Sequence, residues 1–192
     1  MYVIFEGVDT AGKSTQVDML HALYPDAIKT KEPGGTELGM TIRELILHRG
    51  VNNHKTELFL FLADRAEHYK NIIKTYHDKM ILSDRGLISG IAYALANHES
   101  YDLDFLVALN RFALDDKMPD KVVLLLTNEA LINERMGEKN EDMIEKRGIE
   151  YLLKIQAIMI EVLDTLAINY ITIDASKDKE TIHQEIKGFI TS

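Results

Sequence analysis

One short motif constrains the fold of this chain more than any other feature. Residues 7–14 read GVDTAGKS and match the pattern G-x-x-x-x-G-K-[ST] at every fixed position. The apolar run at 1–6 predicts a strand before the motif, and residues 13–23 predict a helix after it that stops before Pro25. A glycine-rich turn in this place lets backbone N–H groups surround phosphate oxygens at the positive end of the helix. The motif therefore predicts a strand–loop–helix unit that binds phosphate.

The remainder of the chain continues this alternation of strands and helices. Apolar runs predict strands at 27–31, 80–83, 122–126 and 170–173, and longer segments predict helices at 36–47, 56–76, 89–96, 103–114, 128–136, 149–168 and from about 179. Strands that alternate with helices indicate right-handed crossovers and a parallel sheet covered on both faces. We expect residues 1–192 to form a single domain, a three-layer α/β sandwich with five parallel strands. The polar, charge-dense segment 137–148 is expected to form a mobile lobe on its surface.

Composition excludes several classes of protein. The 192 residues include no cysteine, which rules out a disulfide scaffold, a thiol nucleophile and a Cys-ligated metal site. The net charge of −9 argues against a duplex nucleic-acid partner, although a few cations can still bind a small phosphorylated ligand. No apolar run approaches the ~18 residues of a membrane helix, and the N-terminus lacks a signal-peptide pattern. These features predict a cytoplasmic protein with no nucleic-acid and no membrane partner.

Two sites carry the chemistry that the residues themselves predict. In the glycine-rich loop, Lys13 is expected to bridge the β and γ phosphates of ATP, and Ser14 to offer a hydroxyl to Mg²⁺. The predicted phosphate-binding residues are Gly7, Val8, Asp9, Thr10, Ala11, Gly12, Lys13, Ser14 and Thr15. Asp84 and Arg85 follow the strand at 80–83, at the edge of a sheet where ligands approach. Either Asp84 holds Mg²⁺ and Arg85 a phosphate, or the two form a local ion pair.

Five stretches of the sequence are more specific than the loop alone. They are FEGVDTAGKST at 5–15, KEPGGTELG at 31–39, FLADR at 61–65, DRGLISGIAY at 84–93 and MPDKVVLLL at 118–126. Together they resemble the thymidylate kinases (dTMP kinases) of bacteria over essentially the whole chain. The resemblance implies the three-layer fold of the P-loop nucleoside monophosphate kinases, with a mobile lid at about 137–148. It also implies ATP and Mg²⁺ as co-substrate and metal, dTMP as acceptor, and a homodimer.

The same resemblance implies contacts with the sugar and phosphate of dTMP. Asp9 would receive the 3′-hydroxyl, and Arg43 and Arg85 would bind the phosphate. Tyr93 would fill the space beside the 2′ carbon and so disfavour ribonucleotides. Two residues of the EPGGT run are assigned to the same substrate pocket, Glu32 and Pro33.

On the base side, the resemblance implies that Phe61 stacks on the thymine and that Arg65 donates to a thymine carbonyl. Ser89 would lie near the base in the same pocket. Phe61 and Arg65 are four residues apart and so share one face of a helix. Ordinary core packing is the alternative for Phe61, whereas an unpaired arginine in an apolar stretch is hard to explain as core.

The lid is expected to supply a cation to the phosphoryl group in transfer. Position 10 is Thr10, whereas one subclass of the family carries an arginine within the loop, and members without that arginine take the charge from the lid. Arg135 and Lys139 are the expected lid cations. Lys146 and Arg147 are either further cations or a solvated charge run.

The resemblance predicts transfer of the γ-phosphoryl group of ATP to dTMP. A phosphate monoester is already ionised at pH 7, so catalysis requires positioning and charge neutralisation rather than a strong base. The expected catalytic residues are Lys13, Asp84, Arg85, Arg135 and Lys139. A deoxynucleoside kinase and a P-loop GTPase switch are the alternatives, and the sequence lacks the guanine-reading motif N-K-x-D.

Overall fold

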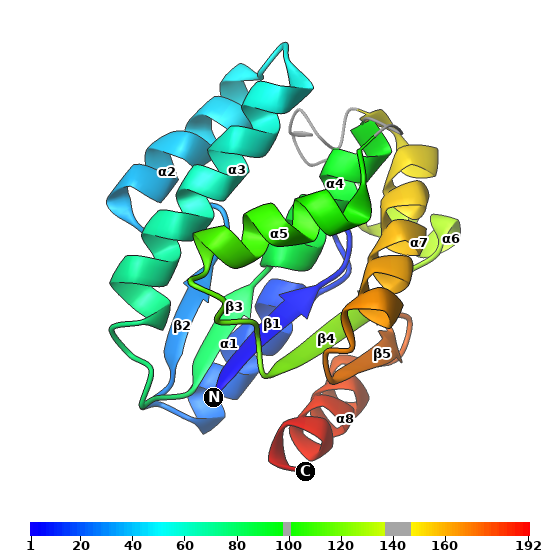
Figure 1. Ribbon diagram of the computed structural model, residues 1–192. Helices are drawn as coiled ribbons and strands as arrows, with labels where there is room; N and C mark the ends of the chain where they lie inside the picture. Colours follow the sequence, from blue (N-terminus) through cyan, green and yellow to red (C-terminus); the bar gives the residue numbers. More distant parts are fainter. Residues whose placement is uncertain (98–100, 137–146) are drawn as a thin grey trace.

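A five-stranded parallel sheet forms the centre of the computed structural model, which describes residues 1–97, 101–136 and 147–192 (Figure 1). The strands are β1 (Tyr2–Glu6), β2 (Ile28–Lys31), β3 (Ile81–Asp84), β4 (Lys121–Leu126) and β5 (Tyr170–Asp174), in the order β2–β3–β1–β4–β5. All the pairings between neighbours are parallel. Strands β1, β3 and β4 have neighbours on both sides and are buried on both faces, which explains their almost continuous apolar sequences. The predicted five-stranded parallel sheet is confirmed.

Helices cover both faces of this sheet. They are α1 (Lys13–Leu23), α2 (Glu37–Glu44), α3 (His54–His68), α4 (Leu87–Asn97), α5 (Leu103–Ala113), α6 (Glu129–Met136), α7 (Ile149–Leu166) and α8 (Lys179–Thr191). Among the helices that the structure describes, none is long and apolar enough to span a membrane.

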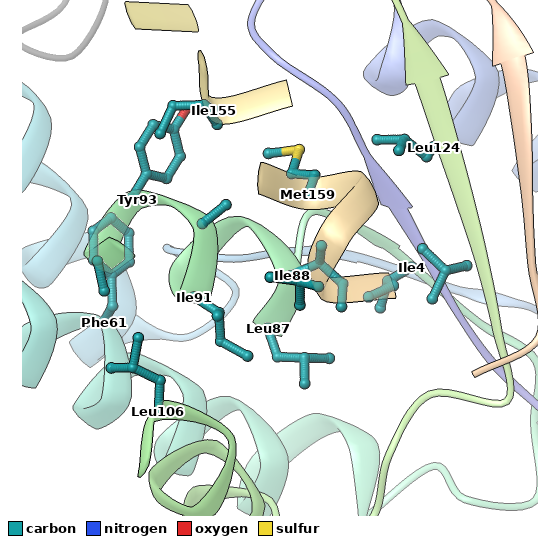
Figure 2. Close-up of a cluster of buried hydrophobic side chains, with 14 of the residues drawn as sticks. Ile4, Phe61, Leu87, Ile88, Ile91, Tyr93, Leu106, Leu124, Ile155 and Met159 are labelled. Carbon is teal, nitrogen blue, oxygen red and sulfur yellow. The ribbon is translucent and has the colours of Figure 1, made fainter. Parts of the chain in front are cut away.

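Alternate residues of β1 separate the two layers of the core. Val3 and Phe5 pack with α1 and α8 on one face, whereas Tyr2 and Ile4 belong to the larger cluster on the other face. In the larger cluster, Ile4 lies beside residues of α4 and α7, such as Ile88 (Figure 2). The predicted three-layer sandwich is therefore observed.

Two helices continue into π-helical turns that the sequence does not predict, and α7 ends at Leu166, two residues before its predicted end. The helix expected at 36–47 is α2 followed by a π-helical turn at Leu45–Arg49, and Gly50, at a φ of +78°, ends it. The helix expected at 56–76 is α3 followed by a second π-helical turn at Tyr69–Ile73. It also begins two residues earlier, because the side chain of Asn53 accepts hydrogen bonds from the first backbone N–H groups of α3. Such local widening leaves the apolar pattern almost unchanged, so periodicity does not reveal it.

The strand register brings the chemistry-bearing loops together. Asp84 at the end of β3 lies level with Phe5 of β1 and with Lys31 of β2. The glycine-rich loop, the loop after β2 and the residues after β3 therefore leave the sheet at the same edge. This is the carboxyl edge, where ligands of open α/β sheets bind.

Candidate active site

The glycine-rich loop joins β1 to α1 in a conformation that depends on its glycines. Gly7 has a φ of +137°, and a Cβ there would lie 2.6 Å from the carbonyl oxygen of Leu125. The Lys13 side chain is buried beneath the loop, and its Nζ donates to the Val8 carbonyl oxygen over 2.8 Å. Burial and the positive charge of Arg85 lower the pKa of Lys13 to about 8. A bound anion would favour the charged form of this lysine.

Two oxygen ligands face each other beside the loop. The Ser14 hydroxyl, in the first turn of α1, donates to Asp84 Oδ2 over 2.5 Å. Within the described residues, no group of three or more His, Cys, Asp or Glu side chains could hold a metal by itself. A hydroxyl with one carboxylate suits Mg²⁺, which keeps several waters and shares its coordination with substrate phosphates.

Arg85 has a left-handed backbone conformation, with a φ of +71°, and its side chain reaches across the edge of the sheet. Its Nη2 forms an ion pair with Asp9 Oδ1 over 2.7 Å, and its Nη1 donates to the Gly7 carbonyl. Burial raises the pKa of Asp9, but Arg85 and Lys13 outweigh it and hold that pKa at about 2. The alternative of a local ion pair between Asp84 and Arg85 is wrong, because Arg85 pairs with Asp9 in the glycine-rich loop.

Glu6 is a supporting residue that sequence reasoning missed. Its fully buried carboxylate accepts hydrogen bonds from the hydroxyl and, over 3.2 Å, from the backbone N–H of Ser89. Ser89 Oγ in turn accepts from Arg85 Nη1 over 3.1 Å. Burial raises the pKa of Glu6. A lone acidic residue at the end of an apolar strand was the available signal, since buried charges need partners.

The loop after β2 is held by polar groups of α3. Glu32 accepts from Arg65 Nε over 2.9 Å and bonds His68 Nδ1 over 2.7 Å, and His68 Nε2 lies 2.7 Å from Thr30 Oγ1. Burial raises the pKa of Glu32, but Arg65 and His68 outweigh it, so the net shift is downward. The Glu32 carboxylate therefore fixes the loop after β2 to α3, and Glu32 also lines the pockets described below.

Arg65 is not the unpaired arginine that the sequence suggested. Besides its ion pair with Glu32, it donates from Nη1 to Asn110 over 2.6 Å and from Nη2 to the Gly86 carbonyl over 2.9 Å. A Cβ at Gly90 would lie 3.0 Å from Nη1, so glycine leaves the room that the guanidinium occupies. Arg65 is thus fixed in place from three sides.

Two adjacent pockets lie above this edge of the sheet. The narrow pocket has a volume of about 40 Å³. It is lined by all the residues predicted for the acceptor: Asp9, Glu32, Pro33, Arg43, Phe61, Arg65, Arg85, Ser89 and Tyr93. The wide cleft has a volume of about 600 Å³ and is lined by the glycine-rich loop, Asp84 and Arg135. The two pockets share part of their wall, which is formed by Asp9, Glu32, Arg43 and Arg85.

Phe61 combines the two roles considered for it. Its side chain belongs to the larger hydrophobic cluster and also lines the narrow pocket. Figure 2 shows its ring in that cluster near Tyr93. Core packing and a place in the lining of the pocket are therefore compatible at this position.

The predicted lid cations have different outcomes. Arg135 donates to the carbonyl oxygens of Thr10 and Ala175 over 3.0 and 2.9 Å, beside the glycine-rich loop. Lys139 and Lys146 lie outside the described residues. Arg147 is not part of a solvated charge run, because it forms an ion pair of 2.9 Å with the buried Glu57.

Asp64 provides a test of the electrostatics of this site. Its Oδ1 accepts from Gly34 N–H over 3.0 Å, while burial and the negative charge of Glu32 raise its pKa to about 6. The folded state thus retains a proton that the unfolded chain, with a pKa near 3.8, releases. The contribution of Asp64 to stability is therefore full below pH ~3.8 and is lost as the pH rises through ~6.

We expect Asp64→Asn to remove this pH dependence, because the amide keeps an acceptor for Gly34 and carries no charge. Relative to the variant, the wild type should lose up to about 3 kcal/mol of unfolding free energy between pH 4 and 7. Urea unfolding of both proteins at intervals of one pH unit measures the difference. Parallel pH profiles for the two proteins would contradict the assignment.

Comparisons with known proteins agree over the length of the chain. The thymidylate kinase family model matches residues 5–186. The thymidylate kinase of Sulfurovum sp. (strain NBC37-1) is 49% identical over 190 residues, which cover 99% of both chains. The thymidylate kinase of Campylobacter concisus (strain 13826) is 49% identical over 192 residues, or 99% of this chain and 98% of the relative. A crystal structure of thymidylate kinase from Ehrlichia chaffeensis has a similar fold, with a TM-score of 0.78, 24% identity, and coverage of 100% of this chain and 98% of that chain.

Proposed function

The chain belongs to the thymidylate kinase family, and from that premise we propose how its pockets divide the two substrates. The enzyme transfers the γ-phosphoryl group of ATP to dTMP, which gives ADP and dTDP. One observation carries the proposal: Asp9, Arg43 and Arg85 line both the wide cleft and the narrow pocket. Two phosphate groups, one from each side, would meet at these arginines. The cleft takes the donor, and the narrow pocket takes the acceptor.

On the donor side, the triphosphate lies in the glycine-rich loop. Lys13 exchanges its bond to the Val8 carbonyl for phosphate oxygens, and the backbone N–H groups of the loop bind the remaining oxygens. The base enters a pocket of about 210 Å³ beside the loop, lined by Gln16, Arg135 and Lys177. This pocket shares no lining residue with the narrow pocket, which supports separate places for the two bases.

Ser14 and Asp84 are the residues that would hold Mg²⁺. Their hydroxyl and carboxylate oxygens are within hydrogen-bond distance of each other and line the wide cleft. When bound, the ion neutralises charge on the β and γ phosphates. Asp84 would therefore be a ligand of Mg²⁺ and not a general base.

On the acceptor side, dTMP binds with its phosphate at Arg43 and Arg85 and its sugar between Asp9 and Tyr93. The base lies against Phe61, within reach of Arg65 and Ser89. The narrow pocket holds only a few water molecules at about 40 Å³, so lining side chains move when the nucleotide enters. Glu32 and Pro33 form the wall beside Arg43, whose Nη1 donates to the Pro33 carbonyl over 3.0 Å.

Catalysis then needs no strong general base. The acceptor phosphate is largely ionised at pH 7, since its second pKa is about 6. Lys13, Arg43 and Arg85 offset the repulsion between the two anions and hold them in line. Arg135 and Lys139 complete the set of cations around the transferring group.

The substrate assignment is tested by ADP release in three parallel reactions. With ATP present, dTMP should give rapid turnover, whereas thymidine and buffer alone should give only background. Turnover of thymidine in place of dTMP would indicate a deoxynucleoside kinase. In a fourth reaction, with GTP and no acceptor, release of GDP faster than the background release of ADP from ATP would indicate a GTPase switch.

We also propose that the enzyme acts in the cytoplasm, where its nucleotide substrates are found.

Two copies of the chain are further proposed to associate through α3 and α5. Phe59, Phe105 and Phe112 on these helices are 60%, 53% and 86% exposed. An apolar groove of about 540 Å³ lies between the helices, and the ion pair Lys74–Asp115 stands at its rim. Exposed aromatic residues inside a polar rim are typical of a protein interface. An isologous dimer would bury these phenylalanines against their own copies.

Phe112→Asp should convert the dimer into a monomer, because it places a charge at the centre of the proposed interface. The melting temperature of the isolated subunit should change little, since the side chain lies outside its core. Size-exclusion chromatography with light scattering measures the mass of the variant and of Leu23→Asp, a matched control on α1. A wild-type monomer, or a Phe112→Asp dimer, would refute the assignment.

A further inference from the structure

A cluster of polar side chains joins α4, α7 and the residue before Gly148. The Tyr151 hydroxyl donates to Asn97 Oδ1 over 2.6 Å and accepts from Arg147 Nη1 over 2.9 Å. The guanidinium carbon of Arg147 lies 5.3 Å from the centroid of the Tyr151 ring. Both ends of this tyrosine are therefore held, its hydroxyl by hydrogen bonds and its ring by a cation–π contact.

Glu57 of α3 anchors the cluster from below. Glu57 is 4% exposed, and its carboxylate accepts from Arg147 Nη2 over 2.9 Å and from Asn97 Nδ2 over 3.1 Å. A buried carboxylate without its cation is costly, which fixes Arg147 in this place. Arg147 in turn fixes the ring of Tyr151.

Tyr151 also contacts a residue that lines the narrow pocket. Its ring stacks on Tyr93, with a centroid distance of 6.4 Å and an interplanar angle of 29°. Tyr93 lines that pocket together with Phe61, and Figure 2 shows Tyr93 beside Ile155 of α7. Glu57 and Phe61 are four residues apart on α3, so one helix face carries both the anchor and a wall of the pocket.

We propose that Tyr151 is a positioning residue for the acceptor nucleotide. It sets the orientation of Tyr93 and thereby the distance between the Tyr93 ring and the sugar. The inference rests on the proposed function, which places Tyr93 beside the 2′ carbon of dTMP. Tyr151 does not line the pocket itself. It acts through Tyr93, which does.

The test compares Tyr151→Leu with Tyr151→Phe. Leucine removes the aromatic stack, whereas phenylalanine keeps the ring and removes the two hydrogen bonds. The measured quantities are kcat and KM for dTMP and for its 2′-hydroxyl analogue 5-methyluridine monophosphate, the KM for ATP, and the Kd of dTMP by calorimetry. The matched control is Tyr170→Leu on β5. Tyr170 does not line the narrow pocket, and its hydroxyl donates to Asp164. Thermal unfolding of each variant separates loss of folding from loss of function.

For Tyr151→Leu we expect the preference for dTMP over the ribonucleotide to fall about tenfold, as for a change in a steric wall of a specificity pocket. The KM and Kd for dTMP should rise by a similar factor, with the KM for ATP unchanged. Tyr151→Phe should fall between Tyr151→Leu and the wild type, and Tyr170→Leu should match the wild type. Should Tyr151→Leu not fold, Tyr151→Phe alone decides, with a loss of at least about threefold in preference expected.

An unchanged preference and unchanged Kd for dTMP in a folded Tyr151 variant would overturn the inference. A fall in kcat alone, with both binding quantities unchanged, would also overturn it. Failure of the proposed function looks different, because the wild-type protein itself would then neither bind nor phosphorylate dTMP.

Discussion

Replacement of Lys13 by alanine should abolish phosphoryl transfer and leave the protein folded. The ammonium group lies beneath the glycine-rich loop. It is the cation of the loop motif itself, and it lines the cleft proposed for the donor phosphates. Loss of one preorganised donor costs about 10²–10³-fold in kcat, and a cation at a transferring phosphoryl group is worth about 10³–10⁵-fold. The measurement is the initial rate of dTMP-dependent ADP release at saturating ATP.

The fold should tolerate the change, because burial of Lys13 opposes its charged form. Its pKa of about 8 lies below the ordinary 10.5, so folding releases a proton between these values and stability rises with pH across that range. Lys13→Ala should lose this rise. The matched control is Lys29→Ala, an exposed lysine of β2 that pairs with Asp18 and should retain wild-type activity. A Lys13→Ala enzyme with near wild-type rate would refute the role of the loop.

Replacement of Glu32 by alanine should destabilise the protein more than any other single change considered. It leaves the Arg65 guanidinium buried without its ion pair and removes the carboxylate that bonds His68 Nδ1. Removing one partner of a buried ion pair costs about 3–5 kcal/mol. Urea unfolding at pH 7 measures the change in unfolding free energy. The KM for dTMP should rise, since Arg65 loses one of the three contacts that hold it at the narrow pocket, whereas the KM for ATP should stay the same.

A double-mutant cycle with Arg65→Ala separates the ion pair from general packing. The two changes should be less than additive, with a coupling energy of at least about 1 kcal/mol. Glu37→Ala, an exposed acidic residue in the first turn of α2, is the control and should leave stability unchanged. Stability of Glu32→Ala equal to the wild type would contradict the arrangement around α3.

Local patterns predicted the parts of this molecule that are close in sequence. The strand, loop and helix around residues 7–14 follow from apolar periodicity and from glycine positions, and all three were found where expected. The acceptor residues were grouped by resemblance, and the structure brings them to one pocket.

The pairings between those residues could not be predicted, because they join distant parts of the chain. Arg65 and Glu32 are 33 residues apart, and Arg85 and Asp9 are 76 apart. A pattern of polar residues within an apolar helix shows that partners are needed, but it does not identify them. The same holds for Arg147, whose partner Glu57 lies on a helix 90 residues earlier.

We propose that this enzyme phosphorylates dTMP in preference to other nucleoside monophosphates. The most direct test is one reaction with limiting ATP and equal concentrations of dTMP, CMP, UMP and AMP, in which the diphosphates formed are separated and measured. We expect dTDP to be the main product and its formation to disappear in Lys13→Ala. Equal or greater formation of CDP or UDP, or of ADP beyond the amount that matches the ATP consumed, would contradict it.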